Sequence, residues 1–347
     1  MKKATDTILK FILVYTTLFV SSTGPEKVKK IHPKFKMAQS ICLSMYDTNN
    51  SISALSYNVW GLPIRLPGHD QTTRFQKLAD SLSSRNFNII CLQEVFHKNI
   101  RKELSNKLLP DYFHASDYEC NQNIVGKWIQ KDCYGGLMTL SKFPILQENF
   151  YRFKNLEKAS IIERIGGKGF LFTTILWNGE PVNIINTHLY AGGGHQAVAC
   201  RKNQILQMEE ILQSIESYQR YPTLLFGDLN VIHSTVATSI PPEVYRYITT
   251  EMSFCDNKEV LDENSYTINP TLNSYTSPNE QKQKLDYIMI HNPEFSSTSI
   301  RIEEEGYDFY GCSALSDHLG WKAQLIYQGI RQNDNLLVLN KGTIFPN

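Results

Sequence analysis

The sequence lacks the signature motifs of several enzyme and metal-site classes. No Gly-x-Ser-x-Gly segment occurs, which argues against a serine hydrolase with a nucleophile elbow. The nucleotide-binding pattern Gly-x₄-Gly-Lys-Ser/Thr is also absent, because "GGKGF" does not have the required spacing. Among the seven cysteines there is no Cys-x-x-Cys pair and no Cys/His cluster, so structural zinc is not expected.

An excess of charge of one sign is missing as well. The 35 basic and 34 acidic residues give a formal net charge of +1, which argues against a nucleic-acid-wrapping protein. The net charge does not exclude a local cluster of basic residues. With 41% hydrophobic and 20% charged residues, the composition is that of a soluble globular protein. A chain of 347 residues holds one large domain or two modest ones.

Complete pairing of the cysteines within the chain is excluded, because their number is odd. Cys91 lies in the apolar run "NIICLQEV" and is expected to be buried. Cys120 and Cys133 flank a polar loop and are the pair we expect to be bridged if the protein is exported. Two free thiols at these positions are the alternative.

The N-terminus has the layout of an export signal. The basic segment "MKKATDTILK" precedes an apolar run at residues 11–20, and the small residues "SSTG" follow. This run is shorter than the roughly 20 residues that cross a bilayer. We therefore assign residues 1–24 to a signal peptide or N-terminal anchor, and expect a secreted or extracytoplasmic protein, free or membrane-associated. An ordinary buried or interfacial segment is the alternative, and residues 25–50 are interpreted as a basic linker.

Strand and helix patterns alternate from residue 51 onward. The segment "SISALSYNVW" alternates like a strand, and an amphipathic helix is predicted over residues 196–217. No internal repeat or clear linker interrupts the pattern, so we predict one α/β domain over residues 51–328 and a tail over residues 329–347. A first helix is predicted within "TTRFQKLADSL", where one face carries Phe75, Leu78, Ala79 and Leu82.

Several apolar runs end at polar residues that can bind metal or phosphate. In α/β sheets, ligands bind where side chains at strand ends converge. One such residue is ordinarily only a strand terminus, but a series offering Asn, Asp, Glu or His is not expected by chance. The series comprises Asn58, Glu94, His188, Asp228, Asn230, Asp286, Asp317 and His318.

The chemistry of these side chains narrows the function. Hard oxygen ligands without cysteine suit Mg²⁺, which keeps coordination positions for water and substrate phosphate. A neutral histidine beside acids suits a general base, because its ordinary pKa lies near neutral pH. Together these groups favour metal-assisted hydrolysis of a phosphate ester.

In order along the chain, "YNVWGLP", "LQEV", "NTHL", "GDLN", "LDYI" and "SDHLG" resemble the motifs of the endonuclease/exonuclease/phosphatase superfamily, the relatives of deoxyribonuclease I. The resemblance extends from Ser53 to Gln324. It implies a four-layered α-β-β-α sandwich, with two mixed β-sheets packed face to face and helices outside.

The resemblance also implies a metal site. Glu94 would be the main Mg²⁺ ligand, with Mn²⁺ or Co²⁺ as substitutes. Asn58 would lie on the metal or its water, and Asp317 would help a metal site or hold its loop.

Catalytic roles follow from the same resemblance. His318 would be the general base that activates water for in-line attack, and Asp286 would orient its imidazole. Asp228 and Asn230 would position the nucleophile and the phosphate. His188 would donate to the phosphoryl oxygens as charge builds.

Within the superfamily, the sequence is most similar to secreted bacterial neutral sphingomyelinases. "YNVWGLP", "GGLMTLSKFPI" and "RIGGKGFLF" carry this similarity. In the last segment Lys168 would contact the phosphate or tune the site, and an exposed turn lysine is the alternative. "NTHLYAGGGHQAVACR" departs from the pattern, which leaves the lipid head group open. His195 in that segment is the remaining histidine of interest.

The implied reaction is hydrolysis of sphingomyelin to ceramide and phosphocholine by a monomer at a membrane surface, without nucleic acid as partner. Trp128, Ile129 and Tyr134 in "IVGKWIQKDCY" would touch the membrane, unless this loop packs on the sandwich. A nuclease or phosphoinositide phosphatase of the same superfamily is the first alternative. The Tyr-Arg pair expected after "FGDLNV" in that phosphatase branch is missing. An inactive homologue that binds lipid or a protein partner is the second.

Overall fold

The computed structural model describes most of the chain from residue 50 to residue 330. The described residues are 50–62, 70–108, 111–115, 122–125, 129–131, 134–154, 163, 166–233, 242–257, 261–294, 296, 298–311 and 314–330. Within these residues no helix combines the length and hydropathy needed to cross a membrane.

Several predictions fall outside the described residues. These are the signal peptide or anchor at 1–24, nearly all of the linker at 25–50, and the tail beyond residue 330. Trp128 and the cysteines Cys120 and Cys133 also lie outside, so the predicted membrane contact and disulfide stay predictions.

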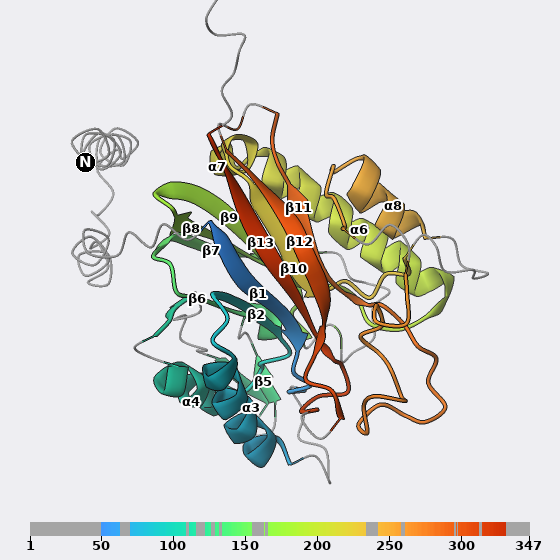
Figure 1. Cartoon of the computed structure of the whole chain (residues 1–347). Coiled ribbons are helices and arrows are strands. Elements are labelled where there is room, and N and C mark those ends of the chain that lie inside the picture. Colours follow the sequence, from blue (N-terminus) through green and yellow to red (C-terminus); the bar gives the residue numbers. More distant parts are fainter. Residues whose placement is uncertain are drawn as a thin grey trace, which may run out of the picture. The chain divides into compact units, whose positions relative to one another are not determined.

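Two mixed sheets form the centre of the domain (Figure 1). The six-stranded sheet has the order β12-β13-β1-β2-β6-β3, and the five-stranded sheet has the order β11-β10-β9-β8-β7. Strands β4 and β5 pair separately. The bounds in the first sheet are β12 Thr298–Asp308, β13 Gly320–Ile330, β1 Ser51–Asn58, β2 Ile89–Gln93, β6 Met138–Ser141 and β3 Phe113–Ala115. Those in the second and in the pair are β11 Asp286–His291, β10 Thr223–Asp228, β9 Glu180–His188, β8 Gly169–Trp177, β7 Ile145–Arg152, β4 Gln122–Val125 and β5 Ile129–Lys131.

The two sheets pack face to face over a shared apolar core. Ile52 and Ile89 of the first sheet join Ile184 and Phe226 of the second in one buried cluster. Because side chains alternate across a strand, the neighbouring positions point to the outer faces and need covering. This arrangement confirms the predicted pair of packed sheets.

Helices cover both outer faces. On the six-stranded sheet, α3 (Gln71–Arg85) and α4 (Lys98–Leu108) share a buried cluster with β1 and β2. The five-stranded sheet packs against α6 (Gly194–Gln213) and α8 (Glu243–Thr250) (Figure 1). A short helix, α7 (Glu216–Arg220), follows α6, and a 3₁₀ turn spans Tyr134–Gly136. The predicted four-layered α-β-β-α sandwich is therefore confirmed.

The helix predictions are confirmed at α3 and need one correction. The predicted face of α3 is buried, and Cys91 is buried as expected. The predicted single helix over residues 196–217 is wrong at its end, because α6 stops at Gln213. The Ser214 amide donates to the carbonyl oxygens of Ile211 and Leu212, and Ile215 is extended before α7 begins.

Candidate functional site

Strand register places three of the predicted site residues side by side in the five-stranded sheet. Asp228, the last residue of β10, stands opposite His188 of the parallel strand β9. On its other side it stands opposite Asp286, the first residue of the antiparallel strand β11. Polar residues at the ends of three apolar strands therefore meet at one edge, as the sequence pattern predicted.

The six-stranded sheet contributes the remaining groups at the same edge. Asn58 ends β1, Glu94 follows the parallel strand β2, and His318 precedes β13, which is antiparallel to β1. The Asn58 side-chain amide donates to Glu94 Oε1 at 3.2 Å and to Asp228 Oδ2 at 2.9 Å. This amide therefore links the strand ends of the two sheets.

The backbone at this edge is unusual for non-glycine residues. Trp60, Glu94 and Asn230 all have positive φ, with values of 51°, 61° and 52°. Such conformations cost energy and cluster at functional sites, where the surrounding structure holds them. Gly61 permits the close approach, because a Cβ there would lie 2.3 Å from the Glu94 carbonyl oxygen.

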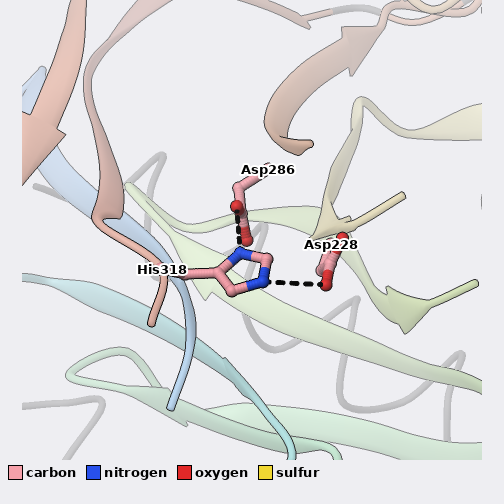
Figure 2. Close-up of side chains that lie close together, drawn as sticks. All are labelled: Asp228, Asp286 and His318. Carbon is pink, nitrogen blue, oxygen red and sulfur yellow. Dashed lines mark hydrogen bonds and ion pairs between the residues drawn. The ribbon is translucent and has the colours of Figure 1, made fainter. Parts of the chain in front are cut away.

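A histidine–carboxylate pair stands at the centre of the site (Figure 2). His318 Nδ1 lies 2.8 Å from Asp286 Oδ2, and His318 Nε2 lies 3.8 Å from Asp228 Oδ2. These three residues offer ligand atoms within 4.8 Å of one another, a spacing that a metal ion would also fit. The 2.8 Å contact is a hydrogen bond, however, so one ring nitrogen and one carboxylate oxygen are already engaged with each other.

The electrostatics of this pair favour a basic imidazole. Burial by itself lowers the pKa of His318, but the carboxylates of Asp286 and Asp228 raise it well above its ordinary value. Asp286 holds the Nδ1 position, so Nε2 faces Asp228 without a hydrogen bond to it.

Glu94 has the properties expected of a metal ligand. Its side chain is 13% exposed, and its Oε2 is a buried acceptor without a hydrogen-bond partner among the residues that the structure describes. Burial and the nearby charge of Asp317 raise the pKa of Glu94 to about 7. An unpaired hard oxygen among neighbouring carboxylates fits a divalent cation, so the residues present are compatible with the predicted metal.

Lys168 is not the exposed turn lysine that was the alternative. It is 4% exposed, and its Nζ lies 2.9 Å from Glu163 Oε2, 2.7 Å from the Leu189 carbonyl oxygen and 3.0 Å from His188 Nε2. Because the ammonium can only donate, His188 Nε2 accepts and its proton is on Nδ1. Within the described part of the chain, that Nδ1 has no hydrogen-bond partner. Burial, followed by the charge of Lys168, lowers the pKa of His188, so the ring is neutral.

The last two predicted residues line the same edge. Asn230 donates from its backbone N to Asp228 Oδ1 at 3.1 Å and from its side chain to the Leu189 carbonyl oxygen at 3.3 Å. Asp317 accepts from Ser316 Oγ at 3.2 Å. The structure therefore brings all nine predicted site residues to one strand edge, while their individual roles stay predictions.

Arg74 is a structural member of the site that the motifs do not include. It is 6% exposed, and its guanidinium donates to the carbonyl oxygens of Val59, Trp60 and Leu315. These contacts join the segment after β1 to the segment before β13. The available signal was an arginine on the apolar face of α3, four residues before Leu78, since arginine is rarely buried without partners.

The family model described as "Endonuclease/Exonuclease/phosphatase family" matches residues 55–318. Sphingomyelinase C of Leptospira interrogans is 29% identical over 228 residues, which are 60% of this chain and 40% of that protein. Sphingomyelinase C of Bacillus cereus is 23% identical over 275 residues, which are 73% of this chain and 80% of that protein. The chain thus spans less than half of the Leptospira relative.

A solved structure shares the fold. It is a Staphylococcus aureus beta toxin mutant with bound magnesium ions, which aligns with a TM-score of 0.55 at 20% identity and covers 79% of this chain and 99% of that chain. The predicted resemblance to this superfamily is confirmed. With a matched segment that holds every predicted site residue, the chain belongs to the endonuclease/exonuclease/phosphatase family.

Proposed function

We propose that the protein is a Mg²⁺-dependent phosphodiesterase that hydrolyses sphingomyelin to ceramide and phosphocholine. The observation that carries the proposal is the buried Asp286–His318 pair, whose free nitrogen faces Asp228, at the edge where Glu94 keeps an unpaired oxygen. The choice of lipid is supported by relatives from two bacterial genera that are named sphingomyelinase C.

In this proposal Glu94 holds the metal, with Asp317 and Asn58 beside it. Bound there, a divalent cation supplies positive charge that polarises the phosphate and lowers the pKa values of nearby acids. His318 Nε2 takes a proton from water while the water oxygen bonds to phosphorus in line with the leaving group. The bond between phosphorus and the ceramide oxygen breaks, and that oxygen takes up a proton from solvent.

Other side chains act on the orientation and the charge of the reacting groups. Asp286 keeps the His318 ring in the tautomer that leaves Nε2 free, and Asp228 accepts a hydrogen bond from the attacking water. The neutral ring of His188 donates its unpartnered Nδ1–H to a phosphoryl oxygen as negative charge develops. Lys168 fixes that proton by donating to Nε2, which makes it a positioning residue.

The cellular setting is part of the proposal. We assign residues 1–24 to a signal peptide or N-terminal anchor and place the active monomer outside the cytoplasm, at a membrane surface that it contacts peripherally. The basic start of the sequence, the following apolar run and the naming of the bacterial relatives support this setting.

The test uses the full chain and measures phosphocholine release from sphingomyelin liposomes in Mg²⁺ or in EDTA. His318→Ala is the catalytic variant, and His195→Ala is its matched control because His195 is exposed at the first turn of α6. Duplex DNA and a phosphoinositide are parallel substrates. Release that requires both Mg²⁺ and His318 is the expected result.

Two other results would overturn parts of this proposal. Turnover of DNA or phosphoinositide alone, still dependent on His318, would keep the catalytic mechanism and reject the lipid. No turnover of any substrate, together with liposome binding that His318→Ala leaves unchanged, would reject the enzyme in favour of an inactive lipid-binding homologue.

A further inference from the structure

Trp60 and Tyr275 form a corner of two aromatic rings beside the site, here called the aromatic corner. Their ring centroids are 5.9 Å apart and the ring planes meet at 62°. Tyr275 is 43% exposed, an unusual exposure for a large aromatic side chain in the described part of this protein. Trp60 is partly buried. The corner therefore presents ring surface to solvent.

Hydrogen bonds hold the backbone of both aromatic residues to the segments that carry the predicted metal site. The backbone N of Trp60 donates to Asn58 Oδ1 at 3.0 Å. The backbone N of Tyr275 donates to Asn273 Oδ1 at 3.0 Å, and the buried Asn273 amide in turn donates to the Ser316 carbonyl oxygen at 2.9 Å.

Thr276, the residue after Tyr275, makes a second hydrogen bond to the segment before β13. Thr276 Oγ1 donates to the Asp317 carbonyl oxygen at 2.8 Å. The backbone that carries the corner is thus held to Asn58 on one side and to the Asp317–His318 segment on the other, which reduces the ordering cost of binding a ligand there.

A buried arginine already makes cation–π contacts with both rings of the corner. The Arg74 guanidinium lies 5.0 Å from the Trp60 ring centroid and 6.0 Å from that of Tyr275. Arg74 is buried and bonded to three backbone carbonyl oxygens, so it approaches the rings from the protein interior. The 43% exposure of Tyr275 leaves ring surface for a second cation, and the negative charges of Asp317 and Glu94 act on Arg74 and offset its repulsion of that cation.

We propose that the aromatic corner binds the quaternary ammonium of a choline head group while its phosphate lies at Glu94 and His318. This inference rests on the proposed sphingomyelin hydrolysis and deepens it by assigning the residues that select the head group. A quaternary ammonium has no N–H to donate, so a carboxylate gives it little specificity, whereas aromatic ring faces attract it through their quadrupole. A two-carbon link joins this nitrogen to the phosphate ester oxygen, which suits a subsite next to the catalytic edge.

The experiment compares sphingomyelin with an analogue in which a neutral tert-butyl carbon replaces the quaternary nitrogen. Both substrates have the same shape, so the ratio of their kcat/KM values reports the charge alone. Detergent micelles replace liposomes, so that membrane docking does not enter the comparison. Calorimetric titration of phosphocholine and of 3,3-dimethylbutyl phosphate into the Mg²⁺-loaded full chain gives the same ratio for binding, independently of turnover.

The variants separate ring electrostatics from apolar volume. Tyr275→Phe keeps the ring and should retain the preference for the charged head group. Tyr275→Leu keeps an apolar side chain without a ring. Its ratio of kcat/KM for the charged over the neutral substrate should fall about threefold to tenfold, which is the contribution expected of a cation–π contact at an exposed to partly desolvated site. Tyr310→Ala is the matched control. Tyr310 is 53% exposed, and its ring packs against Tyr307.

If Tyr275→Leu leaves the kcat/KM ratio of the two substrates unchanged, the proposed subsite is overturned. This includes the case in which kcat/KM falls equally for both substrates. In either case wild-type turnover of sphingomyelin would leave the proposed function intact. A wild-type protein that turns over neither substrate would reject the proposed function itself. Preferential binding of phosphocholine that Tyr275→Leu abolishes would then still support the aromatic corner as a choline site.

Discussion

At the scale of single residues, Asp286 controls the base through one hydrogen bond. Replacing it with asparagine removes the charge that holds the His318 imidazole, and should lower kcat by about 10²- to 10⁴-fold, as for catalytic triads that lose this carboxylate. In the metal-free protein the same change should lower the pKa of His318, because Asp286 is the largest influence that raises it. Histidine NMR titration in EDTA measures this shift, with the exposed His195 as internal reference. An unchanged His318 pKa would contradict the assignment.

The titration of Glu94 should make both the stability of the metal-free protein and its stabilisation by Mg²⁺ depend on pH. The pKa of Glu94 rises from an ordinary 4.5 to about 7 in the metal-free protein, so the charged form is disfavoured in the folded state. Between these values a rising pH lowers the stability of the EDTA-treated protein through this group. A cation competes with the proton, so the Mg²⁺-induced rise in Tm should be larger at pH 8 than at pH 5.5.

Glu94→Gln supplies the control for this experiment. The variant keeps the shape of the side chain but cannot carry its charge, so most of the Mg²⁺-dependent stabilisation and its pH dependence should disappear. Thermal unfolding with and without Mg²⁺ at both pH values makes the measurement. A rise in Tm that survives the substitution would place the metal elsewhere.

At the scale of elements, the approach of β10 to β9 depends on Gly227, the residue before Asp228. A Cβ at this position would lie 2.2 Å from the Thr187 carbonyl oxygen, whereas one at Gly306 in β12 would meet nothing within 4 Å. Gly227→Ala should therefore lower the free energy of unfolding by about 1–3 kcal/mol. Gly306→Ala should change it by at most about 0.5 kcal/mol. Urea denaturation distinguishes the two, and equal effects would show that β10 can move away.

Some elements of the fold were predictable from the sequence and others were not. The helix α3 was predictable because its apolar residues repeat with helical spacing, and the strand ends were predictable because polar residues stop apolar runs. The break after Gln213 carries no glycine or proline, so it depends on backbone bonds that only the folded chain forms.

The surroundings of individual side chains were harder to predict from the sequence than the ends of strands. Lys168 stands among glycines and resembles a turn residue, but its burial depends on Glu163 and on the Leu189 carbonyl oxygen, which the sheet brings to it. The same holds for Tyr275, which meets Trp60 only in the fold. Motifs therefore predicted which residues gather at the site, but not the contacts that position them.

At the scale of the whole molecule, a buried charge network joins the two sheets. Lys284 precedes β11 of one sheet, and its Nζ lies 3.6 Å from Glu305 Oε1 of β12 in the other and 3.4 Å from both oxygens of Asp256. The Lys284 ammonium also lies 4.5 Å from the ring centroid of Trp321 in β13. The charged groups of this network are at most 2% exposed.

Removing the lysine should cost more than removing the whole set of charges. Lys284→Met removes the ammonium that lies between two buried carboxylates and should lower the free energy of unfolding by about 3–5 kcal/mol. Combining it with Asp256→Asn and Glu305→Gln should recover much of that loss. Chemical denaturation of the single and triple variants tests this expectation. A single variant as stable as the wild-type protein would show that the sheets do not depend on this network.

The pairing of β1 with β13 links residues from the two ends of the domain, with Ser51 opposite Ile326 and Ser56 opposite Trp321. A ribosome synthesises β1 long before β13, and such distant pairings form slowly. Until the segment with His318 and β13 emerges, the nascent chain contains Glu94 but cannot place His318 beside it. The order of synthesis thus delays the proposed activity until the domain is complete, so a producing cell's own phospholipids face no working enzyme while translation continues.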